Sequence, residues 1–208
     1  MSSAELVALV CCDLSAVVRG RSLLEWDLDD HLRAGVSWVP ANHSLTPHGP
    51  LADRTPFGST GDLRLLPDPA TRVRVEAALR DGVAAHGGVA ARAHGCVELD
   101  VPGETALELV LCDIVETDGT PWDCCPRRFL RDALGALERE LGARVVASFE
   151  HEFQLATDAP AAAPFSLEAQ RRAEPFAAAA MGALLEAGAQ PERFFPEFAA
   201  HQFEIPVA

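Results

Sequence analysis

The sequence predicts an α+β protein, because short apolar strands and turns fill its first half, while amphipathic helices alternate with extended segments in its second half. The chain has 208 residues, of which 49% are hydrophobic and 23% are charged. This composition is ordinary for a globular protein with a sizeable core, and the length suffices for one large domain or two small ones. No internal repeat is present.

The charge balance excludes two classes of partner. The net charge is −14, and all 17 basic residues are arginines. Non-specific binding to nucleic acid or to anionic lipid needs a positive surface, so we expect neither partner. No apolar run approaches the roughly 18 to 20 residues of a membrane span, and the apolar start ELVALVCC is too short for a signal peptide. We therefore expect a cytoplasmic protein.

The cysteine pattern favours neither a zinc site nor a disulfide framework. None of the six cysteines forms a Cys-x-x-Cys pair, and zinc ligands usually need two to four residues between them. We expect all six to be reduced and none to bind metal, with Cys11 and Cys12 on opposite faces of one strand. The six are Cys11, Cys12, Cys96, Cys112, Cys124 and Cys125.

The first half of the chain reads mainly as strands joined by turns and loops. Alternating apolar residues and turn-forming residues indicate these elements. We expect a hairpin over 5–23 that turns at Asp13–Ser15, then a helix over 25–35 that Gly35 ends. A strand over 35–41, a long loop over 41–60 and a strand over 62–68 follow. After these we expect a weak helix and a loose hairpin over 76–105, and then a strand over 106–115.

The second half contains two helices with clear boundary signals. Pro126 suits the first turn of a helix and Gly142 ends it, with an apolar side formed by Phe129, Leu130, Ala133, Leu134, Leu137 and Leu141. A second helix runs from a Ser166 cap to Gly188, with a kink expected at Pro175. We expect extended segments over 143–157, 193–198 and 201–207.

Four glutamates lie in the apolar extended segments of the second half. Glu150 and Glu152 are two positions apart and therefore share one face of a strand, and Glu197 and Glu204 lie in segments that also favour burial. Alternate glutamates are common on the solvent face of an ordinary sheet. A strand–helix–strand arrangement, however, would bring both segments into one sheet, where clustered carboxylates suit Mg²⁺ or Mn²⁺.

Several motifs resemble the glutamine synthetase superfamily in the order that family has them. SFEHEFQL followed by PEFAAHQFEIPVA resembles its E-x-E-F strand and its E…GQ-x-E strand. VALVCCDLSAVVRGRSL resembles its opening hairpin, GSTGDLRLLPDPAT its S-D-x-x-L-x-P-D-x-x-T segment, and ETDGTPWDCCPRRFL its D-G-x-P…D-P-R helix start. The resemblance covers nearly the whole chain.

The resemblance implies a β-grasp N-terminal domain over 1–117 and a truncated catalytic domain over 118–208, with an antiparallel sheet and helices. It implies an ATP-dependent ligase that joins the γ-carboxylate of glutamate to ammonia or an amine, with Mg²⁺ or Mn²⁺, in a homo-oligomer. Glu152, Glu197 and Glu204 match the ligands of one metal, Glu150 matches a ligand of a second, and Glu192 falls where the family has a nucleotide-contacting glutamate. No catalytic residue is assigned.

The sequence departs from the family pattern at three places. His201 replaces a usual glycine, and Cys125 replaces the aspartate of D-P-R. The loop PANHSLTPHG replaces D-G-S-S, so Asn42 or Ala41 stands near the position where the family has the aspartate that helps bind ammonium. The altered loop leaves room for a larger amine, so a γ-glutamyl-alkylamine or polyamine ligase is one alternative.

The chain ends soon after Glu204, before the region that in the family carries a further histidine, a glutamate and several arginines. We therefore expect an N-terminal portion that is inactive alone. A non-catalytic scaffold paralogue is the second alternative, and the identity of the amine stays open.

Overall fold

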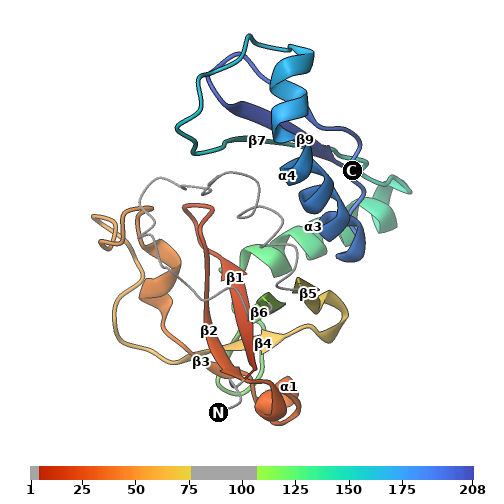
Figure 1. Ribbon diagram of the computed structural model, residues 1–208. Helices are drawn as coiled ribbons and strands as arrows, with labels where there is room; N and C mark the ends of the chain where they lie inside the picture. The colour runs from red at the N-terminus through yellow and green to blue at the C-terminus, as the bar shows by residue number, and fades with distance from the viewer. Residues whose placement is uncertain (1–4, 76–106) are drawn as a thin grey trace. The chain divides into compact units, whose positions relative to one another are not determined.

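The computed structural model describes residues 5–75 and 107–208 (Figure 1). It divides into two compact units. Among the described residues, the first unit contains 5–74 and 107–145, and the second contains residue 75 and 146–208. The predicted α+β class is confirmed. The domain boundary at residue 117 stays a prediction, although contacts group residues 118–145 with the first unit.

A mixed sheet forms the centre of the first unit. Its strand order is β2-β1-β6-β4-β3, with β5 also paired to β6. The central β1–β6 pair is parallel, whereas β1–β2, β3–β4 and β4–β6 are antiparallel. The strands are β1 (Leu6–Cys12), β2 (Val18–Leu24), β3 (Val36–Trp38), β4 (Leu63–Pro67), β5 (Val73–Val75) and β6 (Leu107–Glu116).

The predicted hairpin at the start of the chain is confirmed, and Asp13 explains its turn. Its Oδ1 accepts hydrogen bonds from the backbone N–H groups of Ser15 at 2.8 Å and Val17 at 2.9 Å, and its Oδ2 pairs with Arg19. Burial alone would raise the pKa of Asp13, but the Arg19 bond and the backbone donors together hold it below its ordinary value.

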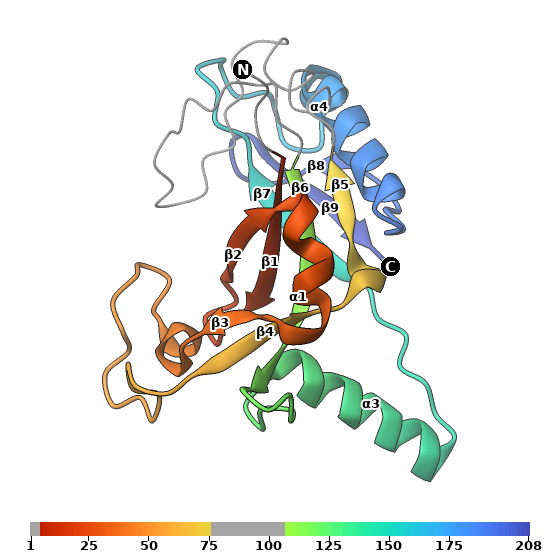
Figure 2. The same ribbon diagram turned by 90° about the horizontal axis from the view of Figure 1, so that it is seen from below.

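Short helices connect the strands of the first unit, and the predicted helix over 25–35 is confirmed. Gly35 follows α1 with a φ of 63°, a conformation that glycine adopts without steric cost. The apolar side of α1 contributes Leu28 to the core of the unit. Figure 2 shows α1 lying across the strands of this unit, where it contacts β4. These helices are η1 (Glu25–Asp27), α1 (Leu28–Ala34), η2 (Pro40–Ser44) and η3 (Pro69–Thr71).

Alternation along the central strands fills the core of the first unit. Leu9, Leu65 and Ile114 are fully buried, as expected for inward positions of central strands. Close packing also explains Gly20 on β2, where a Cβ atom would lie 2.1 Å from the carbonyl oxygen of Leu9. Cys11 is buried and Cys12 is exposed, which confirms that they face opposite sides of β1.

The predicted helix at 126–142 is α3 (Pro126–Leu141), with Pro126 in its first turn and Gly142 in the left-handed conformation after it. Arg127 anchors its start, because its guanidinium bonds Asp68 at 2.6 Å and Asp113 at 2.8 Å. The apolar residues on one side of α3 are less buried than their helical spacing suggests. Phe129, for example, is 73% exposed within the described structure.

In its described residues, the second unit is a three-stranded antiparallel sheet covered by one long helix. Its strand order is β7-β9-β8, so the two glutamate-bearing segments do share a sheet, as predicted. Its elements are β7 (Phe149–Gln154), α4 (Leu167–Glu186), β8 (Phe195–Pro196) and β9 (Gln202–Val207). A small core of Leu155, Ala173 and Phe203 joins the helix to the sheet.

The boundaries of α4 agree with the predicted signals. The Ser166 hydroxyl accepts a hydrogen bond from the N–H of Ala169, which makes Ser166 the N-cap, and Gly188 follows the helix with a φ of 79°. Pro175 lies inside the helix, where its missing N–H removes one backbone hydrogen bond.

One expectation about extended structure is wrong, and another concerns residues outside the described ones. The strand predicted over 143–157 is limited to β7, because 143–148 pairs with no strand among the described residues and Val146 is 96% exposed. The weak helix and hairpin predicted at 76–105 lie outside the described residues. No helix within 5–75 and 107–208 is long and apolar enough to cross a membrane.

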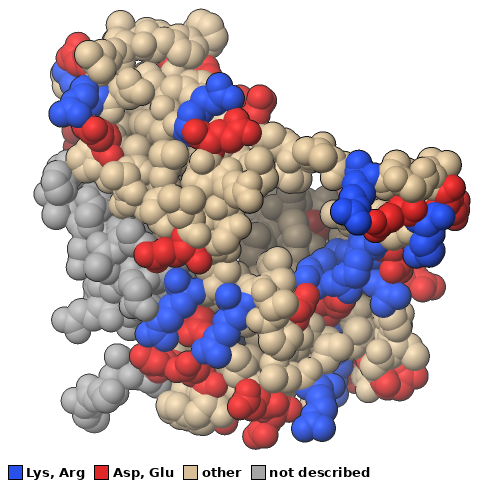
Figure 3. Space-filling view, turned by 90° about the vertical axis from the view of Figure 1, so that its right-hand side faces the viewer, with Lys and Arg blue, Asp and Glu red and all other residues tan. Residues whose placement is uncertain are grey.

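The buried carboxylates of the first unit, Asp13 and Glu108, are paired with arginine. Buried Glu108 bonds Arg72, and it also lies 3.3 Å from Arg74. Figure 3 shows the same pattern on one face of the molecule, where arginines lie beside acidic side chains. Surface pairs of this kind contribute little each, but a buried carboxylate such as Glu108 needs its partners.

Candidate functional site

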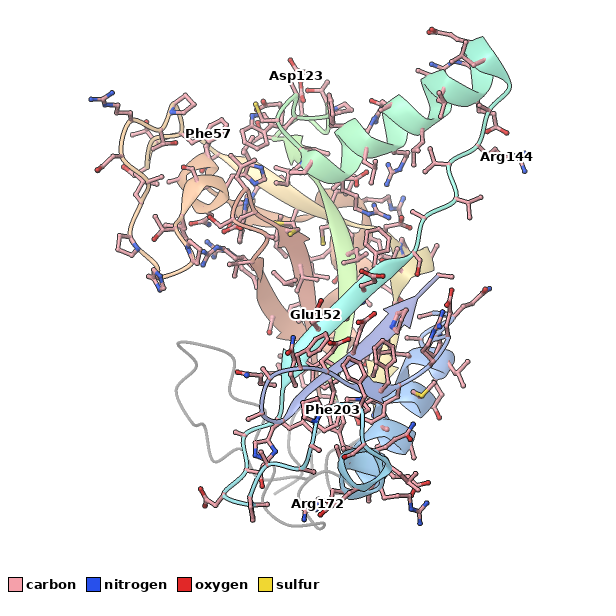
Figure 4. The ribbon with its side chains drawn as sticks, turned by 90° about the horizontal axis from the view of Figure 1, so that it is seen from above. Phe57, Asp123, Arg144, Glu152, Arg172 and Phe203 are labelled. Carbon is pink, nitrogen blue, oxygen red and sulfur yellow. The ribbon has the colours of Figure 1, made fainter. Side chains whose placement is uncertain are left out.

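The strand register places the predicted glutamates on one side of the second unit's sheet. Glu152 on β7 lies directly opposite Glu204 on β9, and paired residues share a face. Glu150, two residues before Glu152, has the same orientation. Figure 4 shows Glu152 on β7 and Phe203 on β9, the residue that packs on the helix-covered side instead.

Glu197 joins this set from the end of β8. Its backbone N–H donates to the carbonyl oxygen of Gln202 at 2.8 Å, which continues the β8–β9 pairing by one residue. Its side chain is half-buried and shares a hydrogen bond with Glu204. We call the side of the sheet formed by Glu150, Glu152, Glu197 and Glu204 the carboxylate face.

The carboxylates of this face interact strongly enough to perturb one of them. Burial raises the pKa of Glu204, and the negative charges of Glu150, Glu197 and Glu152 and the hydrogen bond with Glu197 raise it further. Within the described residues, none of the four makes an ion pair with arginine or histidine. The face is therefore rich in negative charge that the described chain does not neutralise.

The donor chemistry of the carboxylate face fits a hard divalent cation. Mg²⁺ and Mn²⁺ prefer oxygen ligands, and four carboxylates whose mutual repulsion raises a pKa would be relieved by such an ion. In the described part of the chain, however, no three His, Cys, Asp or Glu side chains are gathered closely enough to hold a metal. Binding would require these flexible side chains to turn toward one another.

Gln202 is a residue of this face to which the sequence analysis gave no role. Its Nε2 donates to Glu152 Oε2 at 2.6 Å, and its Oε1 accepts from the N–H of Ala199 at 3.0 Å. The second bond fixes the orientation of the amide, so the NH₂ group points at Glu152 and holds that carboxylate in place. The Gln-x-Glu spacing was the available signal, because residues two apart on a strand share a face.

The neighbouring His201 explains why the related motif usually has glycine there. His201 has a φ of 57°, in the left-handed region that costs a non-glycine residue about 1 kcal/mol. Its imidazole makes no hydrogen bond within the described residues. Glu192 lies before β8 in the chain, where its backbone N–H donates to Pro206 O at 2.9 Å and its exposed carboxylate lies 3.0 Å from Arg193.

The two other departures from the family pattern have structural explanations. Cys125 is buried, and its Sγ accepts a hydrogen bond from the N–H of Ile114 at 3.2 Å, so the thiol ties the start of α3 to β6. In the loop over 40–49, His43 is buried against the rings of Phe57 and Trp122. No residue of this loop lines the cavity of the second unit described next.

A cavity of about 330 Å³ lies within the second unit, between α4, the segment 157–164 and the start of β9. We call it the α4 cavity. Its wall is largely alanine, proline and phenylalanine, and polar groups reach it from Arg172, Glu197, His201 and Gln202. Glu197 and Gln202 thus border both the α4 cavity and the carboxylate face. No pattern in the sequence indicates this cavity, because it is formed by three segments that meet only in the fold.

Comparisons with known proteins agree with the resemblance of the motifs. The family described as glutamine synthetase N-terminal domain matches residues 1–92. The crystal structure of a glutamine synthase homolog is 40% identical to this chain with a TM-score of 0.80, and the alignment covers 100% of this chain and 45% of that one. No curated protein matches the chain.

More distant structures share the fold. GmaS in complex with ADP is 16% identical, with a TM-score of 0.61, over 99% of this chain and 42% of that chain. The glutamine synthetase of Plasmodium falciparum is 14% identical, with a TM-score of 0.57, over 99% of this chain and 41% of that chain. The chain thus spans less than half the length of these proteins. It belongs to the glutamine synthetase superfamily, as an N-terminal portion of that fold.

Proposed function

We propose that this chain supplies the metal-binding carboxylates of a carbon–nitrogen ligase of the glutamine synthetase type. Such an enzyme condenses the γ-carboxylate of glutamate with ammonia or an amine at the expense of ATP. One observation carries the proposal: Glu150, Glu152, Glu197 and Glu204 share one sheet face and have no cationic partner among the described residues. The cytoplasmic location and a homo-oligomeric assembly belong to the same proposal.

Each residue has a role in this proposal. Glu152, Glu197 and Glu204 would hold one Mg²⁺ or Mn²⁺ ion, and Glu150 would contribute to a second. Bound there, the ions would supply positive charge to the oxygens of the phosphoryl group that ATP transfers. Gln202 positions Glu152 through its 2.6 Å hydrogen bond, and Glu192 contacts the nucleotide. The first unit would be the β-grasp domain, with the parallel β1–β6 pair at its centre.

The chain alone is expected to be inactive. Phosphoryl transfer spreads negative charge over the transferred group, and loss of an arginine-type partner can lower the rate by about 10³ to 10⁵. The carboxylate face offers no such cation of its own. This chain covers 45% of the homologous structure, so the cationic partners would come from a polypeptide that corresponds to the remainder.

Metal binding tests the proposal before any turnover is measured. We expect Mn²⁺ to bind the full chain, as followed by its electron paramagnetic resonance signal. Glu152→Gln is expected to weaken binding by about tenfold or more, because a ligand is lost. Glu186→Gln, an exposed glutamate at the end of α4, is the matched control and should bind as the parent does. Equal binding by all three proteins would overturn the metal assignment.

A measurement of amide formation distinguishes a ligase from a non-catalytic scaffold. We expect ATP-dependent amide formation from glutamate and an amine only when the chain is extended with, or supplied with, the remainder of a homologous enzyme. Amide formation by the chain alone, abolished by Glu152→Ala, would contradict the expected inactivity. Failure of both metal binding and turnover in the extended protein would favour a non-catalytic scaffold.

One observation favours an alkylamine over ammonia as the acceptor. The α4 cavity borders Glu197 and is far larger than an ammonium ion requires. The altered loop over 40–49, which by sequence leaves room for a larger amine, instead buries His43 among aromatic rings. The feature that favours a larger amine is therefore the α4 cavity of the second unit.

A further inference from the structure

We propose that the α4 cavity is a binding site for a primary amine with an apolar tail, whose ammonium group lies at Glu197. This inference deepens the proposed function, because it names the class of amine that the same site would accept. It is carried by the volume of the cavity, by its wall, and by the different charges at its two ends.

The wall of the cavity is built to take an apolar group. Ala169 and Ala173 face it from α4, Phe176 and Phe203 close its inner side, and the segment 157–164 contributes further alanines and prolines. The space exists because alanines stand where larger side chains would fill it. A lining of this kind, with a few polar groups at its edge, is the ordinary form of a small-molecule site. A cavity of about 150 Å³ holds a benzene molecule, so about 330 Å³ suffices for a ring and a short chain.

The charged groups at the edge of the cavity decide which head group fits. Arg172 is already neutralised, because it pairs with Glu168 and also donates to Pro160 O at 2.7 Å. Glu197 has no cationic partner among the described residues, and it adjoins three further carboxylates. A cation is therefore attracted to the Glu197 end, whereas an anion finds no uncompensated positive charge at the Arg172 end.

His201 and Gln202 limit the orientation of the ligand. Gln202 lines the cavity, and the orientation of its amide is fixed because it bonds Glu152 and the N–H of Ala199. The imidazole of His201 lines the cavity and has no hydrogen-bond partner in the described chain. With the ammonium group at Glu197, the tail extends toward α4 and the amine nitrogen stays at the border of the carboxylate face.

Direct binding to the full chain tests this inference without any need for turnover. The probes are phenethylamine, 3-phenylpropionate, which has a similar tail but a negative head, and methylamine, which lacks the tail. By calorimetry without divalent cations, which would compete for Glu197, we expect phenethylamine to bind at least about tenfold more tightly than either other probe, because only it combines the buried ring with the correct charge. Equal or tighter binding of phenylpropionate would overturn the inference.

Two pairs of variants locate the site. Ala169→Leu fills the cavity from α4 and is expected to weaken phenethylamine binding at least about tenfold, since the ring loses its space. Ala178→Leu makes the same change at an exposed position of the same helix and should have no effect. Glu197→Gln should remove the preference for amine over carboxylate, whereas Glu186→Gln should keep it. If Ala169→Leu does not fold, Ala162→Leu fills the cavity from the loop side. Unchanged phenethylamine affinity in a folded cavity-filling variant would contradict the proposal.

A Mn²⁺ titration on the same preparation distinguishes this inference from the proposed function. Phenethylamine binding without Mn²⁺ binding would support the cavity assignment and overturn the metal assignment. Mn²⁺ binding without selective phenethylamine binding would overturn the cavity assignment alone.

Discussion

The two compact units of this protein differ in how they use burial and charge. Among the described residues, the core cluster of the first unit contains eleven buried side chains, whereas that of the second unit contains three. The first unit pairs its buried carboxylates with arginine, as Asp13 and Glu108 show. The second unit places four carboxylates on one face without such partners. The first unit is thus built for stability, and the second carries unrelieved charge beside a cavity.

This difference is what a site of chemistry requires. Strongly interacting, unpaired carboxylates destabilise the fold that holds them, and such sites are accepted when a ligand relieves the strain. The strand that carries Glu150 and Glu152 is also the edge of its sheet and is mostly exposed. We therefore expect the second unit to open at a lower free energy than the first, as measured by amide hydrogen exchange.

The largest effect should come from the core of the first unit. Leu65 is fully buried on β4, so Leu65→Ala is expected to cost about 3 to 5 kcal/mol through lost burial and a new cavity. All three tryptophans, Trp26, Trp38 and Trp122, belong to this unit, and their fluorescence reports its unfolding in urea. Leu155→Ala in the smaller core of the second unit should leave the tryptophan transition nearly unchanged. An equal shift for both variants would show that the units unfold together.

A second contrast concerns glycine. Gly20→Ala in the first unit is expected to destabilise by about 2 to 3 kcal/mol, because the new Cβ would meet the Leu9 carbonyl oxygen and force the hairpin apart. Gly182→Ala inside α4 meets no atom within 4 Å and should stabilise the second unit by about 0.5 to 1 kcal/mol. Thermal unfolding followed by circular dichroism measures both. A neutral Gly20→Ala would contradict the packing described for β1 and β2.

In the third contrast, removal of a carboxylate charge is expected to destabilise the first unit but to stabilise the second. Glu108→Gln weakens two contacts with arginine in a buried position, so it should destabilise the first unit by about 1 to 2 kcal/mol. Glu204→Gln relieves repulsion on the carboxylate face and should stabilise the metal-free second unit. Hydrogen exchange of each unit without divalent cations provides the measurement. Destabilisation by Glu204→Gln would mean that the four carboxylates do not repel one another.

The smallest effect is a pH dependence in the first unit. Burial lowers the pKa of His43, and the negative charge of Asp13 only partly offsets this. Because the folded pKa lies below the unfolded value of about 6.5, His43 contributes stability above that pH, and the contribution is lost as pH falls through the folded pKa. The tryptophan transition should therefore weaken from pH 6.5 downward, and His43→Phe should flatten this dependence. His48→Phe, at an exposed position, should retain it.

The local elements were largely predictable from the sequence, because their signals are local. Asp13 accepts backbone hydrogen bonds within its own turn, Ser166 caps its own helix, and Gly35 and Gly142 end helices through their own φ angles. The strand over 143–157 was overestimated for the opposite reason. Apolar residues such as Val145 and Val146 suit a strand, but a segment becomes a strand only where a neighbouring strand forms backbone hydrogen bonds with it.

The site was predictable in part. Alternation placed Glu150 and Glu152 on one face, and the motif resemblance added Glu197 and Glu204. Whether these glutamates hold metal, and whether Glu192 contacts a nucleotide, stay predictions. The hydrogen bond from Gln202 to Glu152 and the cavity beside Glu197 were not predicted, since each depends on residues from separate segments.

The sequence by itself determined the α+β class, most element boundaries, the family and the four candidate ligands. These follow from periodicity, capping residues and short motifs, whose physical causes act within a few residues of the chain. Only the tertiary structure decided that Glu152 faces Glu204, that Cys125 ties α3 to β6, and that alanines of α4 leave a cavity beside Glu197. Strand register and packing determine such contacts. They bring together side chains that are far apart along the chain, and the number of residues between two side chains does not determine their distance in space.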